Sequence, residues 1–150
     1  MFKPIEKTAS VTCISIEDPA IDLDASNMQE YAGIAIKQPG RWSEFIKTKP
    51  GEALTRFVVG VLPSDEANRI IDDCGLHRGE LKASELAWRS FLATCRGVEG
   101  WPDEVPKGAD GYVDKAWLKA TFAKGLRRVA CEIGMYAWQW NQLTEDEVKN

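Results

Sequence analysis

Pro63 divides the chain into two parts whose apolar residues follow different spacings. Residues 1–62 contain three runs with the alternating or continuous apolar pattern of strands, whereas apolar residues in 63–150 recur every three to four positions, as in helices. Strands followed by helices along a chain are typical of α+β folds. The sequence therefore predicts an α+β fold, with a small N-terminal β-sheet packed against three C-terminal helices.

The length of 150 residues is that of one domain, so we expect a single domain over 1–150, with a β-rich part at 1–62 and a helical part at 63–150. The strand candidates are 11–16, 31–36 and 55–62. The last of these is almost continuously apolar up to Pro63, a pattern typical of a strand that is covered on both faces.

The three predicted helices span about 64–74, 78–96 and 115–140, with a Gly- and Pro-rich loop at 97–113 between the last two. Ser64 and Asp114 are the expected N-caps of the first and third helices, and Gly75 is expected to end the first in a left-handed conformation. Gly125 and Gly134 lie inside the third helix, where they permit close packing or a bend. A capping box at 144–147 predicts a last short turn.

Composition disfavours proteins that bind nucleic acid and proteins that are secreted or span a membrane. The net charge of −4 disfavours a nucleic-acid partner, and no apolar run is long enough for a signal peptide or a membrane span, so we expect no membrane partner. The four cysteines are widely spaced, which favours buried free thiols in a protein of the cytosol.

Side chains that could carry chemistry are few. The one histidine, His77, forms a C-x-x-H pair with Cys74, but a zinc site usually needs four ligands from two close pairs. The carboxylate pairs Asp72-Asp73 and Asp22-x-Asp24 are typical of a solvated helix face and a loop. We therefore expect no catalytic residue, no metal site and no cofactor, and a protein that is not an enzyme.

Tryptophan is unusually frequent, with six residues against three tyrosines and five phenylalanines. Trp88 and Trp140 fall on apolar helix stripes, whereas Trp117 and Trp138 fall off the stripe of the third helix, beside a basic cluster. Trp and Arg are enriched at interface hot spots. The candidate partner-binding residues are Trp101, Tyr112, Trp117, Lys124, Arg127, Arg128 and Trp138.

Two alternatives stay open for these residues. The third helix could be buried on two sides, with its off-stripe tryptophans packed under the N-terminal half of the chain. Trp101, in the Gly- and Pro-rich loop, could pin that loop to the core rather than serve as an exposed docking residue. Trp42 has no assigned role.

Residues 85–150 resemble small structural and assembly proteins of tailed-bacteriophage morphogenesis modules, such as tail-assembly chaperones and minor virion proteins. The resemblance rests on the run 91–101, the Asp-Gly-Tyr at 110–112, the amphipathic helix that follows, and the charged C-terminus 143–150. It implies a β-rich first half with a helical second half, and a protein that binds other structural proteins without an active site.

The expected function is that of a non-enzymatic bacteriophage structural or assembly protein, a virion component or tail-assembly factor. Its partners would be phage structural proteins or further copies of itself, in the host cytoplasm during assembly or in the virion. A phage-encoded inhibitor of a host protein and an enzyme of unrecognised type are the alternatives. On this hypothesis, charge reversal at Arg127 and Arg128 leaves the fold intact and abolishes partner binding.

Overall fold

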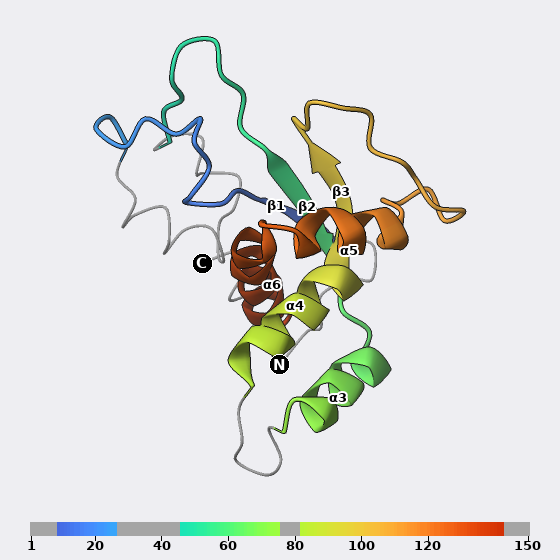
Figure 1. The fold of residues 1–150 in the computed structure, drawn as a ribbon. Coiled ribbons are helices and arrows are strands. Elements are labelled where there is room, and N and C mark those ends of the chain that lie inside the picture. The colour runs from blue at the N-terminus through green and yellow to red at the C-terminus, as the bar shows by residue number, and fades with distance from the viewer. Residues whose placement is uncertain (1–8, 27–45, 76–81, 143–150) are drawn as a thin grey trace.

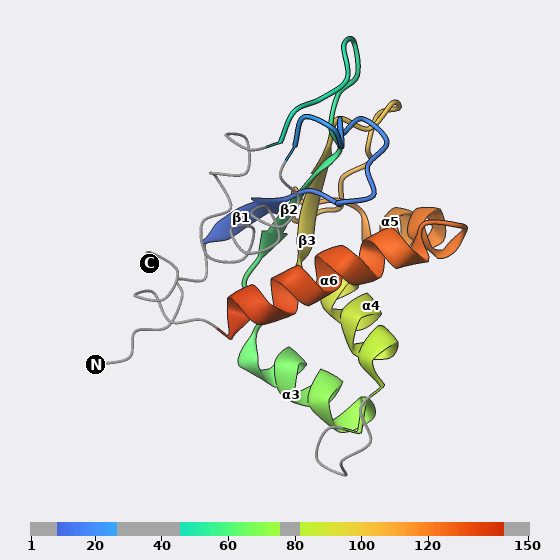
Figure 2. The same ribbon diagram turned by 90° about the vertical axis from the view of Figure 1, so that its left-hand side faces the viewer.

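The computed structural model describes residues 9–26, 46–75 and 82–142, and this part of the chain contains a three-stranded sheet and four helices. Figures 1 and 2 show helices α4 and α6 packed on one side of the sheet, with α3 beyond them. The α+β fold is therefore confirmed. The described helices include none that is both long and apolar enough to cross a membrane.

The sheet is antiparallel, with strand order β1-β2-β3, and its strands are Ser10–Cys13, Arg56–Gly60 and Cys95–Glu99. The predicted strands 11–16 and 55–62 correspond to β1 and β2, and the predicted strand 31–36 lies outside the described residues. The expectation that the first half alone forms the sheet is wrong, because β3 comes from the helical half. The helix predicted over 78–96 ends at Thr94, before its predicted end. Cys95 takes an extended conformation there, and its side chain enters the core.

The helices are α3 (Ser64–Asp73), α4 (Ala83–Thr94), α5 (Lys115–Ala123) and α6 (Arg127–Asn141). The predicted single helix over 115–140 is wrong, because Gly125 adopts a φ of +83° that no continuing helix allows. Asp114 caps α5 as expected, since its carboxylate accepts the Trp117 backbone N–H at 2.9 Å. Ser64 is not the N-cap of α3; Pro63 is, and Gly75 takes the expected positive φ.

The main core lies between the sheet and helices α4, α5 and α6. Three buried phenylalanines form its centre: the ring of Phe91 lies 6.0 Å from that of Phe57 and 5.2 Å from that of Phe122. Gly134 lets α6 approach α4 closely, because a Cβ there would overlap the backbone carbonyl of Ala87. Trp88 and Trp140 are buried in this core, as their places on the apolar stripes predict.

Candidate functional site

A groove of about 470 Å³ opens between the N-terminal segments and the junction of α5 with α6. It is lined by residues from 15–20, 52–57 and 100–102, and by Phe122, Leu126 and Val129. We call it the Trp101 groove. Its volume lies within the range of ordinary binding pockets, and most of its lining is apolar.

The floor of the groove is continuous with the core. The ring of Trp101 lies 5.5 Å from that of Phe122 and meets Trp117 edge to face at 5.9 Å. Phe122 in turn meets Phe57 at 5.7 Å. Trp101 is therefore an anchor that pins its loop to the core, and it also presents part of its surface to the groove.

The N-terminal wall of the groove consists of the lining residues from 15–20 and 52–57. Backbone N–H groups of this wall donate hydrogen bonds to one carboxylate. Asp18 accepts the backbone N–H of Ala20 at 2.9 Å and that of Thr55 at 2.8 Å. On the other side, Gly100 has a φ of +74° and lies so close to the Leu54 carbonyl that a Cβ would overlap it. These contacts tie the segments 15–20, 52–57 and 100–102 that line the groove to one another.

A second carboxylate ties the same wall to α6. The Glu132 side chain accepts the Ser15 hydroxyl and the Ile16 backbone N–H, each at 2.8 Å. Burial raises the pKa of Glu132 above the usual range, although its hydrogen bonds to Ile16, Ser15 and Tyr136 oppose this. Burial and the neighbouring Glu132 carboxylate also raise the pKa of the Tyr136 hydroxyl.

The raised pKa of Glu132 predicts a pH dependence of stability. A carboxyl group that binds its proton more tightly in the folded state stabilises the fold most below its unfolded pKa. That contribution is lost as the pH rises from the ordinary value of 4.5 through the raised folded value. Glu132→Gln removes this titration. We therefore expect the unfolding free energy of the wild type, minus that of the variant, to fall across this window in urea titrations. A difference that rises with pH would contradict the prediction.

The charged side chains that line the Trp101 groove, within the described residues, are all acidic: Glu17, Asp18 and Glu52. Arg56 belongs to β2 between two lining residues but does not line the groove. Arg128 reaches the rim from α6, where its Nε lies 3.0 Å from the Glu17 carboxylate. The groove thus combines an apolar floor with a carboxylate rim.

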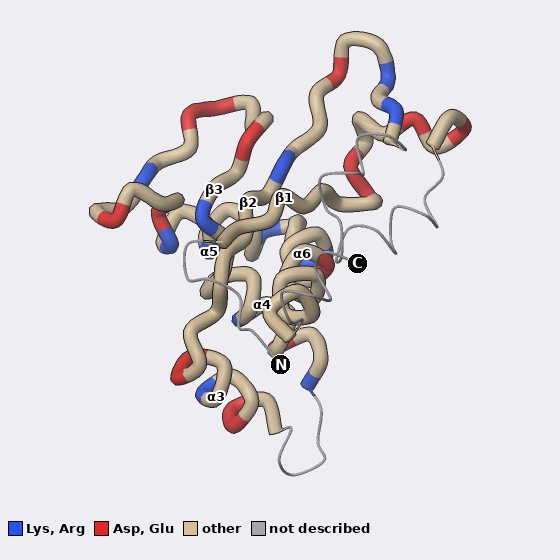
Figure 3. The backbone as a smooth tube through the Cα atoms, turned by 180° about the vertical axis from the view of Figure 1, so that it is seen from behind, with Lys and Arg blue, Asp and Glu red and all other residues tan. Residues whose placement is uncertain are grey.

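The structure separates the predicted basic cluster. Arg127 turns toward α4, with its guanidinium 4.6 Å from the centre of the Trp88 ring and 3.4 Å from the Glu85 carboxylate. Arg128 turns toward Glu17, and Lys124 is exposed before the break at Gly125. Figure 3 shows the basic residues spread over several elements rather than gathered in one patch. The prediction that Lys124, Arg127 and Arg128 form one basic face of a single helix is wrong, because the chain is not helical between α5 and α6.

The predicted aromatic residues also lie in different places. Trp101 and Trp117 are brought together beside the groove, whereas Tyr112 is exposed with Arg96 5.1 Å from its ring centre. Trp138 packs against the cluster that joins α3 to α4 and α6. Trp117 and Trp138 are both partly buried, which fits the alternative in which they serve packing.

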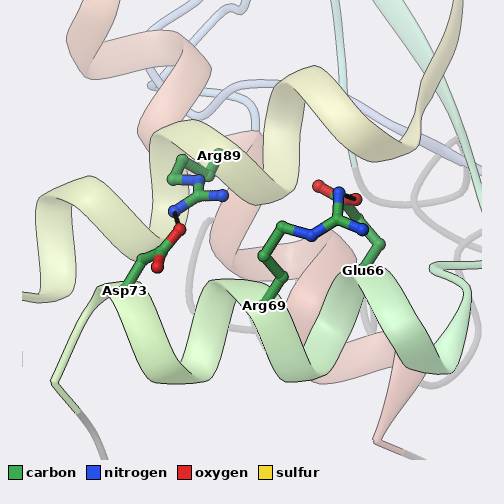
Figure 4. Close-up of polar contacts among 4 residues, drawn as sticks. All are labelled: Glu66, Arg69, Asp73 and Arg89. Atoms are coloured by element: carbon green, nitrogen blue, oxygen red, sulfur yellow. Dashed lines mark hydrogen bonds and ion pairs between the residues drawn. The ribbon is translucent and has the colours of Figure 1, made fainter.

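Ion pairs accompany that packing around α3. Arg89 of α4 binds Asp73 at the end of α3 at 2.5 Å, and Arg69 binds Glu66 one turn away at 2.9 Å (Figure 4). The side chain of Asp73 is 55% exposed, so this contact contributes little beyond the apolar cluster beneath it. The apolar cluster, against which Trp138 packs, is therefore the main attachment of α3 to α4 and α6.

The different contacts of Arg127 and Arg128 predict different effects on stability. Arg127→Glu removes a cation–π contact and places a second carboxylate beside Glu85, so we expect a loss of about 1 kcal/mol. Arg128→Glu changes a side chain that is 88% exposed, and we expect a loss below about 0.5 kcal/mol. Urea denaturation of the two single variants measures this difference, and equal losses would contradict it.

Two of the described thiols, Cys13 and Cys95, are buried and are poor nucleophiles. Burial raises the pKa of the Cys13 and Cys95 thiols to about 12, which keeps them protonated and unreactive at neutral pH. The described chain contains no group of three or more His, Cys, Asp or Glu side chains placed to hold a metal ion. His77 lies outside the described residues.

Comparisons of the chain with models of protein families, with characterised proteins and with solved structures found no match.

Proposed function

We propose that this protein is a non-enzymatic bacteriophage structural or assembly protein that acts by binding another protein through the Trp101 groove. The observation that carries the proposal is the groove itself: an apolar floor that includes Trp101, with carboxylates on the N-terminal segments that line it. The resemblance of residues 85–150 to phage morphogenesis proteins supports the class of protein. The expected partner is a virion or tail-assembly protein, or a second copy of the chain, met in the host cytoplasm during assembly.

The size of the groove suits one or two bulky side chains of a partner. Burial of one large apolar side chain contributes about 1.5–3 kcal/mol, and such anchors dominate the energy of many interfaces. A complete interface would extend beyond the groove, over the surrounding loops. The groove is therefore proposed as the anchoring point of the interface.

Ala53→Arg tests this role. Ala53 is exposed and lines the groove, so an arginine there fills the groove without entering the core. Ala120→Arg is the matched control, since Ala120 is exposed on α5 outside the groove lining. We expect Ala53→Arg to reduce partner binding by more than about tenfold and the control to bind like the wild type.

The partner is identified by mass spectrometry of the tagged chain purified from infected cells, and of purified particles. A virion or morphogenesis protein that the wild type and Ala120→Arg retain, and Ala53→Arg loses, supports the proposal. A host protein retained in the same pattern would instead support an inhibitor of a host process. A partner that Ala53→Arg retains would show that the groove is not the docking site.

A further inference from the structure

We infer that the Trp101 groove takes a bulky apolar side chain flanked by lysine or arginine on a segment of a partner protein. This inference rests on the proposed function, because it specifies the chemistry of the ligand for the same groove. It goes further in assigning the two rim carboxylates, Glu17 and Glu52, as the determinants of specificity.

The apolar requirement follows from the floor. Trp101 presents aromatic surface and is backed at 5.5 Å by the buried ring of Phe122, and the partly buried Leu126 and Val129 add aliphatic surface from the start of α6. A polar or charged side chain placed there would lose water without gaining hydrogen bonds from these residues. A leucine, methionine or aromatic side chain would gain the full benefit of burial.

The basic requirement follows from the rim. Asp18 already uses both carboxylate oxygens to accept backbone N–H groups, so its role is to hold the wall. Glu52 is exposed at the groove, and the described residues place no cation within ion-pair distance of it. The ligand therefore meets at least one carboxylate that its own cation can pair with.

Glu17 shows within the protein how the rim binds a cation. Its carboxylate lies 3.0 Å from Nε of Arg128, whose side chain is 88% exposed. An arginine of the ligand can share or replace this contact at little cost, because an exposed ion pair contributes little to stability. Such rim charges act mainly on specificity and on the rate of association, while the apolar side chain supplies most of the affinity.

The probe is a random nonapeptide library, selected on the wild type, and the selected peptides are then assayed for binding to Ala53→Arg and Ala120→Arg. We expect the selected peptides to carry a central aromatic or large aliphatic residue with lysine or arginine nearby. Synthetic peptides of the selected sequence, with each basic residue kept or replaced by glutamate, then measure the contribution of charge. We expect replacement to weaken binding on the order of tenfold, and the loss to shrink at high salt.

Variants of the protein complete the test. Glu52→Lys should weaken the basic peptide by about three- to tenfold, whereas Asp65→Lys, the same charge change at an exposed position of α3, should not. Peptides that the groove selects with acidic or neutral flanks would overturn the inference and leave the docking role intact. No selection, or peptides that Ala53→Arg still binds, would overturn both.

Discussion

Gly134→Ala should destabilise the protein by about 3 kcal/mol, the reverse of what this substitution does in most helices. Alanine is a better helix former than glycine by about 1 kcal/mol, so the change would ordinarily stabilise α6. Here a Cβ would overlap the Ala87 carbonyl and crowd the Phe91 backbone N–H of α4. A flexible side chain could rotate away from the added Cβ, but the α4 backbone cannot. Helices α4 and α6 must therefore move apart, which loosens the packing of the core between them.

Urea denaturation and the thermal midpoint measure this effect. Gly97→Ala is the matched control, because a Cβ there meets Val58 only at ordinary van der Waals distance, 3.8 Å or more. The control should leave stability unchanged or raise it by less than about 1 kcal/mol, through the unfolded state. If Gly134→Ala proved as stable as the control, the close approach of α4 and α6 would be wrong.

Local signals in the sequence predicted local features well. Pro63 marks the start of α3, the Asp114 side chain caps α5, and Gly75 follows α3 with a positive φ. The prediction that Ser64 is the N-cap of α3 is wrong, since Pro63 occupies that position. Each of these features depends on residues within one or two turns of each other, which a sequence displays directly.

Features that depend on distant partners could not be predicted in this way. Strand β3 forms because residues 95–99 pair with β2 about 40 positions earlier, with a register shift between Val58 and Val59. The two glycines inside the predicted third helix have opposite roles: Gly125 ends a helix and Gly134 permits contact with α4. Both look alike in a helical wheel, and only the packing separates them.

The Trp101 groove illustrates the same limit for function. Its walls come from widely separated segments of the chain, and of the residues predicted for partner binding only Trp101 lines it. Glu17 and Glu52 carried no signal, because a single exposed glutamate is typical of any surface. Their significance depends on lying beside one apolar floor, which the fold alone creates.

Phe122 connects that floor to the core, and Phe122→Ala should have the largest effect on stability, a loss of about 4 kcal/mol. Its side chain is 1% exposed and contacts three other rings: Phe57, Phe91 and Trp101. Truncation leaves a cavity beneath the groove, and the Trp101 indole loses the ring against which it packs. Denaturant unfolding measures the loss of stability, and a shift of tryptophan emission to longer wavelength that is absent when Trp101 is also replaced by phenylalanine reports the greater exposure of Trp101.

Phe122→Leu separates the role of the aromatic ring in ligand binding from the role of the buried volume in stability. Leucine keeps most of the buried volume, so we expect a loss of only about 1–1.5 kcal/mol and a groove that still closes at its base. The weakened contact should nevertheless reduce binding of an apolar ligand, because the Trp101 indole then loses the ring that holds it in position at the groove. Equal losses of stability for the alanine and leucine variants would contradict the central place of this ring. A leucine variant with unchanged stability and unchanged ligand affinity would show that the Phe122 ring does not support Trp101 at the groove.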